Sequence, residues 1–145
     1  MRMVCGWFNK MTRTKELHMY QNPEEVLNAW LAAVLVKDIA AIESLYSDEA
    51  VLIPTFSDQI RRTPETVLDY FKTVGGRADG EIRVDITDLQ TQELSSGIAI
   101  LGGTYDWRFQ ENGEDRYFAA RFSYVIDLGQ DKPILHHHSS AIPGT

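Results

Sequence analysis

Apolar residues at helical spacing dominate the first part of the chain. Asn22 and the Pro-Glu-Glu that follows it have the residue types of a helix cap and first turn, and an apolar stripe continues from there to about Lys37. Asp38 is suited to cap a second, shorter helix whose apolar residues extend as far as Tyr46. The pattern therefore predicts two consecutive helices.

A strand and a third helix are expected next. Ala50–Phe56 is an apolar run that contains Pro54. Proline cannot donate a ladder hydrogen bond, so this strand suits an edge or the rim of a sheet. Thr63, with Pro-Glu after it, begins a third helical pattern, and the pair Gly75–Gly76 is expected to end it.

The second half of the chain has the alternation of β-strands. Asn112–Gly113 predicts a two-residue hairpin turn, because such a turn needs positive φ at both positions. Gly102–Gly103 inside a strand indicates a bulge or a sharp bend. The sheet is expected to be largely an antiparallel meander. Its predicted strands are Glu81–Glu93, Ile98–Gln110, Tyr117–Leu128 and Ile134–Ala141.

The hairpin turn fixes which residues share a face. A two-residue loop at Asn112–Gly113 places Thr104 opposite Arg121 and Asp106 opposite Ala119. Thr104, Asp106 and Arg121 then lie on one face of the sheet. This side is expected to be a polar pocket that meets the protein's own helices.

Three adjacent histidines in the last strand must divide between the two faces, because side chains alternate along a strand. His136 and His138 share a face with Ser140, and an even-length turn before this strand places them beside Arg121. His137 points the other way and is expected in the core or at an interface. A mainly aromatic set on that other face is predicted to meet a second copy of the chain: Tyr105, Trp107, Phe109, Phe118, Phe122, Tyr124 and Ile126.

Length and charge narrow the possible partners. The 145 residues suit about one domain, with a tail or short helix over residues 1–21 and the domain over 22–145. A formal charge of −7 argues against nucleic acid and anionic membranes as partners.

The cysteine content and the apolar runs add two further expectations. Cys5 is the only cysteine, so no internal disulfide is possible. No apolar run is long enough to span a bilayer, and a cytoplasmic location is expected.

The tail has a pattern of its own. Val4, Trp7, Phe8 and Met11 fall at helical spacing with basic residues between them. A short helix packed on the domain or on a neighbouring subunit, a disordered tail and a targeting peptide are all compatible with this pattern.

The helical and strand segments together resemble a known family. LVKDIAAIESLYSDEAVLIPT, RRTPETVLDYF and the final ILHHHSSAIP are similar to the nuclear transport factor 2-like superfamily. Within it they resemble the association (hub) domain of calcium/calmodulin-dependent protein kinase II and its stand-alone bacterial relatives. The resemblance implies an α+β fold, a cone-shaped half-barrel whose curved, mainly antiparallel sheet wraps around about three N-terminal helices. It also implies a homodimer formed through the sheet, with further assembly into rings.

The resemblance also suggests a pocket. The family's strand arginine falls on Arg121 and its last-strand histidines fall on His136 and His138. Further pocket arginines of the kinase hubs have no secure counterpart, since the nearest positions are Thr104 or Tyr105, and Ser139. Superfamily pockets often have a tyrosine at the end of the second helix, where this chain has Tyr46, although a core role suits Tyr46 equally.

The leading hypothesis is a homo-oligomeric binding or assembly module whose pocket accepts a small anion. A guanidinium pairs well with a carboxylate, and protonated histidines would add charge at lower pH. Arg121 paired only with Asp106 is the plainer alternative. A lyase or isomerase using Asp106 and His138, and purely structural oligomerisation, also stay open. Neither a metal nor a cofactor is expected. The ligand-binding candidates are Arg121, His136, His138, Thr104, Asp106, Ser140 and Tyr46.

Overall fold

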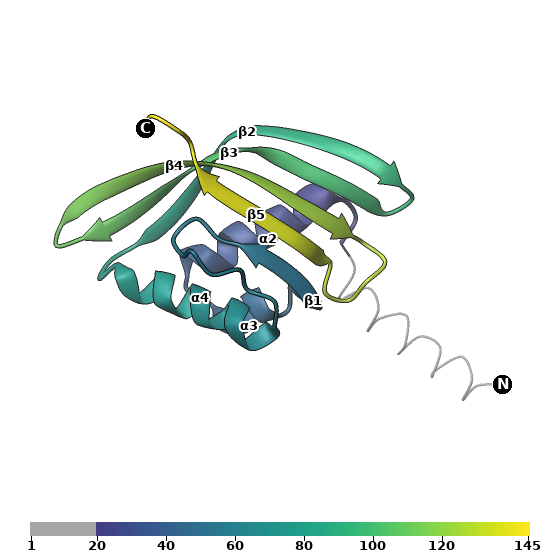
Figure 1. The fold of residues 1–145 in the computed structure, drawn as a ribbon, viewed down its shortest axis with the longest axis horizontal. Coiled ribbons are helices and arrows are strands. Elements are labelled where there is room, and N and C mark those ends of the chain that lie inside the picture. Colours follow the sequence, from purple (N-terminus) through teal and green to yellow (C-terminus); the bar gives the residue numbers. More distant parts are fainter. Residues whose placement is uncertain (1–19) are drawn as a thin grey trace, which may run out of the picture.

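The computed structural model describes residues 20–145 as three helices packed beneath one five-stranded sheet (Figure 1). The helices are α2 (Pro23–Leu35), α3 (Ile39–Glu43) and α4 (Pro64–Arg77). The predicted tail pattern lies outside the described residues. No helix between residues 20 and 145 is long and apolar enough to cross a membrane.

The helix starts follow local capping chemistry. The Asn22 side chain accepts the backbone N–H of Glu25, and Asp38 does the same for Ala41. Thr63 and Thr66 cap each other reciprocally at the start of α4. These three starts confirm the sequence prediction.

Two helix ends differ from the prediction. The second helix ends at Glu43, and Tyr46 begins a strand because Ile134 donates its N–H to the Leu45 carbonyl and pairs with Tyr46. Gly75 and Gly76 lie inside α4, which continues to Arg77. The helix ends where Ala78 becomes extended. Tertiary pairing and packing therefore override the local glycine signal.

The sheet has the order β1-β5-β4-β3-β2, with β1 parallel to β5 and all other pairs antiparallel. The β3–β4 turn confirms the expected register: Asn112 and Gly113 have φ of 52° and 79°, and Thr104 pairs with Arg121. The strands are β1 (Tyr46–Ile53), β2 (Ile82–Ser95), β3 (Ile98–Glu111), β4 (Glu114–Asp127) and β5 (Ile134–Ala141).

The irregularity near Gly102–Gly103 belongs mainly to the neighbouring strand. Pairing between β2 and β3 shifts between Ile86 and Asp88, which leaves Thr87 as the extra residue on β2. The β2 backbone approaches Gly103 so closely that an added Cβ would overlap the carbonyl oxygen of Asp88. The glycine is required by this close approach.

The two faces of the sheet are the reverse of the prediction. The aromatic face packs against the helices, where Trp30 of α2 contacts Tyr105, Trp107 and Tyr124. An interface through this face is therefore excluded, because burying these rings against the chain's own helices already removes them from water. Phe118 of the predicted dimer set is partly buried against the core, and the other six residues are buried: Tyr105, Trp107, Phe109, Phe122, Tyr124 and Ile126. The polar face carries no helix (Figure 1), and we call it the helix-free face.

Candidate functional site

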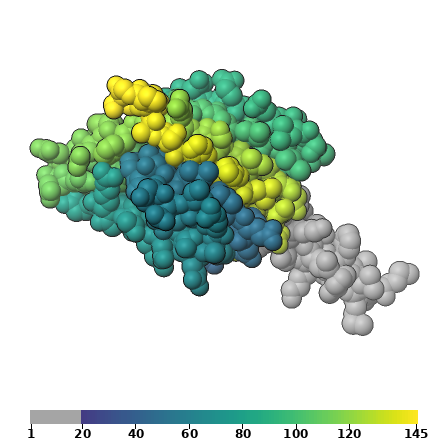
Figure 2. Space-filling view, viewed as in Figure 1, coloured from purple at the N-terminus to yellow at the C-terminus, as the bar shows by residue number. Residues whose placement is uncertain are grey.

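A shallow recess on the helix-free face brings together part of the predicted site. Arg121 and Ser123 of β4 line it with His138 and Ser140 of β5, around a volume of about 180 Å³. The strand pairing explains the arrangement, because Arg121 is opposite Ser140 and Ser123 is opposite His138. Figure 2 shows β5 at the molecular surface as a yellow band beside the blue atoms of β1 and the segment after it. Because Arg121, Ser123 and His138 are exposed, the recess is an open surface feature rather than an enclosed cavity.

Arg121 is not neutralised by a neighbouring acid. Among residues 20–145 no carboxylate lies within salt-bridge distance of its guanidinium, so the expected alternative of an Arg121–Asp106 pair is wrong. Thr104, opposite Arg121, shares a hydrogen bond of 2.7 Å with Thr87. An exposed guanidinium without an acid is available to an anion.

His136 lies one row further along the same face, opposite Val125. Partial burial lowers its pKa below the ordinary value, and the nearby His138 acts in the same direction. His136 is therefore largely neutral near pH 7.

The structure does not bring Asp106 and His138 together. Asp106 pairs with Ala119, whereas His138 pairs with Ser123, which is four residues further along β4. Since β3 and β5 are also separated by β4, the two side chains begin roughly 15 Å apart. An acid–base dyad needs both groups within hydrogen-bond reach of one substrate, and this arrangement provides no such point.

Tyr46 lies on the opposite side of the sheet, inside a buried polar chain that sequence reasoning missed. Trp30 Nε1 donates to the Tyr46 hydroxyl at 2.9 Å, and that hydroxyl is 2.8 Å from His137 Nδ1. On the other side of the imidazole, Nε2 is 3.2 Å from the Tyr105 hydroxyl, which donates to Ser139 Oγ at 2.6 Å. Ser139 in turn contacts Thr55.

One protonation state of His137 satisfies this whole chain. If Nδ1 accepts the Tyr46 proton and Nε2–H donates to Tyr105, every hydroxyl from Tyr46 to Ser139 both accepts and donates. The imidazole is 2% exposed. Burial lowers its pKa well below the ordinary value, and His136 and His138 add to the effect. His137 is therefore a neutral structural residue, as the core alternative predicted.

Ser139 and Tyr105 are two of the positions nearest to the extra arginines of the kinase hubs. Here they bond to each other in the interior. The sequence contained one signal for this arrangement: Trp30, Tyr46, Tyr105 and His137 all fall on apolar faces of their elements. A buried set of polar-tipped rings needs hydrogen-bond partners from within the same set.

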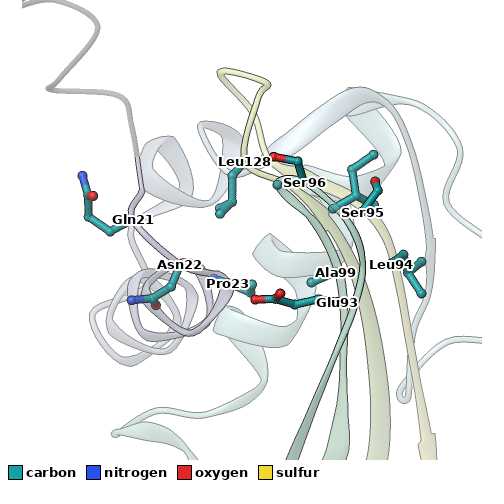
Figure 3. Close-up of a pocket in the computed structure, with 11 residues that line it drawn as sticks. Gln21, Asn22, Pro23, Glu93, Leu94, Ser95, Ser96, Ala99 and Leu128 are labelled. Atoms are coloured by element: carbon teal, nitrogen blue, oxygen red, sulfur yellow. The ribbon is translucent and has the colours of Figure 1, made fainter.

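A separate cavity of about 460 Å³ lies between the start of α2 and the β2–β3 hairpin (Figure 3). Asn22 and Pro23 border it on one side, with Glu93 and Ser95 on the other, and Leu128 also lines it. Among the described residues that line it, Glu93 alone has an ionisable side chain. In the described part of the chain, no cluster of three or more histidine, cysteine or acidic side chains is arranged to hold a metal ion.

Solved structures of proteins from several bacteria have a similar fold. A protein from Xanthomonas campestris described as a calcium/calmodulin dependent protein kinase II association domain is 26% identical, with a TM-score of 0.75 over 82% of this chain and 84% of that one. A protein from Streptomyces avermitilis, assigned as a dehydratase of the NTF2-like family, is 14% identical, with a TM-score of 0.72 over 82% and 93% of the two chains. An NTF2-like protein of Pseudomonas putida KT2440 is 16% identical, with a TM-score of 0.69 over 82% and 83%.

The last two similarities concern the fold alone. No curated protein matches the sequence significantly. The family model of the calcium/calmodulin dependent protein kinase II association domain matches residues 20–143. The chain therefore belongs to the calcium/calmodulin-dependent protein kinase II association domain family, an oligomerisation module with the NTF2-like fold.

Proposed function

We propose that this protein self-associates through the helix-free face of its sheet. The family supplies the expectation of self-association, and the fold narrows the choice of surface. The other face of the sheet is already buried against α2 and its aromatic contacts. The helix-free face is the broad surface that five paired strands leave uncovered.

Aliphatic side chains on this face support the proposal most strongly. Val51, Val125 and Ile100 lie in one row across the sheet, with His136 between the first two and Gln92 at the end. The three aliphatic side chains are only half-buried and lie outside the hydrophobic core of the chain. A second copy would remove them from water, which favours association in proportion to the apolar area covered.

Polar residues flank this row in a way that suits a two-fold contact. The next row is formed by Ile53, His138, Ser123, Gly102 and Gln90, so small residues occupy its centre. The row after that includes Arg121 and Asp88, of opposite charge. In a two-fold dimer the same patch meets itself, so an arginine of one copy can reach an acid of the other.

Sedimentation velocity over a range of concentrations tests the proposal. Val125→Glu places a charge in the aliphatic row and should shift the protein toward a species of 16.5 kDa, the mass of one chain. Val36→Glu is the matched control, because Val36 is 69% exposed at the end of α2, away from the sheet. Equal association of both variants and the wild type would overturn the proposal, provided circular dichroism shows both variants folded.

The recess around Arg121 supports a second candidate, the binding of a small carboxylate. Arg121 has no acidic partner among the described residues, and the hydroxyl groups of Ser123 and Ser140 border the same 180 Å³ volume. A carboxylate there would accept bonds from a guanidinium and hydroxyl groups together. In this second candidate, the carboxylate that pairs with Arg121 belongs to a free small molecule. In the proposed dimer, it belongs to an acidic side chain of the second copy.

A thermal-shift series with acetate, succinate and citrate tests whether Arg121 binds a free carboxylate, as distinct from a carboxylate of a second copy. Free-anion binding predicts stabilisation of the wild type that Arg121→Ala abolishes and that increases as the pH falls and His136 becomes protonated. Arg83→Ala is the control, since Arg83 lies on the same face but contacts Glu81 and Asp85. Equal shifts in the wild type and Arg121→Ala would remove the free-anion candidate while leaving self-association intact.

A further inference from the structure

A cavity on the helix side of the molecule has a composition that differs from the rest of this acidic chain. It occupies about 440 Å³ between α4 and the connection from β1 to α4. Arg61 and Arg77 line it together with Ser57 and Thr73, and none of the residues between 20 and 145 that line it is acidic. In the described part of the chain, two guanidinium groups line the cavity and no acid does, which makes this a positive pocket in a protein of net charge −7.

Arg61 is held in place but is not neutralised. Its backbone N–H and carbonyl both bond to Leu52, at 2.8 and 2.9 Å, which fixes the residue whatever its side chain does. The guanidinium donates to Ser57 Oγ at 2.9 Å and to the Thr66 carbonyl at 3.4 Å. Its Nε is buried without a partner in the described part of the chain, and no carboxylate there lies within salt-bridge distance. Arg61 therefore has unused donors and an uncompensated charge.

Arg77 forms the second cationic wall and is positioned by ring faces. Its guanidinium carbon lies 5.1 Å from the ring centroid of Phe56 and 4.8 Å from those of Phe109 and Phe118. Its acidic partner Glu111, at 3.3 Å, is shared with Arg116. One carboxylate thus serves two arginines, and the group keeps a net positive charge.

Aromatic and hydroxyl groups complete the pocket. The rings of Phe56 and Tyr70 both line it, and the Tyr70 hydroxyl accepts the Phe56 N–H at 3.4 Å. Burial raises the pKa of Tyr70 to about 12, so the hydroxyl keeps its proton near neutral pH and can donate it. Gly76 adds room, since an added Cβ would meet nothing within 4 Å.

We propose that this cavity binds a small aromatic carboxylate. The carboxylate pairs with Arg61, whose planar group matches it in two parallel hydrogen bonds, and Arg77 adds a second positive charge. The ring of the ligand lies against Phe56 and Tyr70. The volume falls within the range of small-molecule sites. None of these residues belongs to the recess on the helix-free face, so the proposal does not depend on the function proposed above.

Benzoate is the probe, and calorimetric titration measures its affinity for the full chain. Arg61→Met keeps the length of the side chain and removes its charge, and it should weaken benzoate binding about tenfold or more. Arg62→Met is the matched control, because Arg62 is the next residue, is exposed and does not line the cavity. Its affinity should equal that of the wild type. Benzyl alcohol, which has the ring without the charge, should bind at least about tenfold more weakly.

Amide chemical shifts of the wild type provide a measurement that does not depend on any variant folding. Benzoate should shift the signals of Tyr70 and Thr73, which both line the cavity. The proposal is overturned if Arg61→Met binds benzoate as well as Arg62→Met does. It is also overturned if benzyl alcohol binds equally well, or if the shifts of Tyr70 and Thr73 do not change.

Discussion

Tyr46 and His137 are hydrogen-bonded through the interior, with the tyrosine hydroxyl 2.8 Å from Nδ1 of the imidazole. The two residues are 91 positions apart, in the neighbouring parallel strands β1 and β5. Through this contact the helix residue Trp30 is linked to the end of the last strand. The buried chain therefore connects α2 to the three strands β1, β5 and β3.

Removal of the Tyr46 hydroxyl should destabilise the protein. Tyr46→Phe leaves Trp30 Nε1 and His137 Nδ1 buried without a partner, which costs about 1–3 kcal/mol of unfolding free energy. Tyr124→Phe is the matched control, because the Tyr124 hydroxyl is buried without a partner among the described residues. It should be neutral or stabilising. Urea denaturation measures both, and equal losses would show that the chain of hydrogen bonds contributes nothing specific.

Stability should decrease as the pH falls below the ordinary pKa of histidine. The folded state holds the pKa of His137 well below that value, chiefly by burial, so below about pH 6.5 the unfolded chain binds a proton that the folded chain does not. The unfolding free energy then falls by up to about 1.4 kcal/mol per pH unit until the folded pKa is reached. His136 shifts in the same direction and adds to the slope.

Denaturant titrations from about pH 7.5 to about pH 5 on the wild type and His137→Phe check this linkage. In the variant, the slope of unfolding free energy against pH should correspond to about one proton fewer than in the wild type. The part of the slope that comes from His136 should remain. An identical slope in both proteins would contradict the assignment of a buried neutral imidazole.

Glycine is needed at position 103 but not at 102. An alanine Cβ at 103 would overlap the Asp88 carbonyl oxygen, whereas at 102 it would make an ordinary contact of 3.5 Å with the Phe122 carbonyl oxygen. We expect Gly103→Ala to cost about 1–3 kcal/mol, with a much smaller effect from Gly102→Ala. Thermal unfolding of the two variants measures the difference. A tolerated Gly103→Ala would mean that the bulge at Thr87 relaxes easily.

Short-range sequence patterns predicted the strands and their register correctly, but they did not predict which face of the sheet packs against the helices. Asn112–Gly113 fixed the pairing of Thr104 with Arg121, because the turn geometry depends on two residues only. The assignment of faces failed at Tyr105 and Trp107. Large aromatic side chains with polar tips suit both an interface and a core, and only the position of Trp30 in three dimensions decides between them.

The candidate sites show the same limit. Arg121, His138 and Ser140 were grouped correctly, since alternation along paired strands places them on one face. The Arg61–Arg77 cavity was not predicted, because its residues come from a loop and from residues 70–77 of α4. Their proximity depends on how α4 packs against the sheet, and no short-range pattern specifies that.

Distances between labels on two copies of the chain test the proposed surface most directly. Two single-cysteine proteins carry a spin label at Ser123→Cys, on the helix-free face, or at Lys72→Cys, on the exposed side of α4, with Cys5→Ser in both. Self-association through the helix-free face predicts strong dipolar coupling between copies at position 123 and a much longer distance at position 72. Coupling at 72 with none at 123 would contradict it.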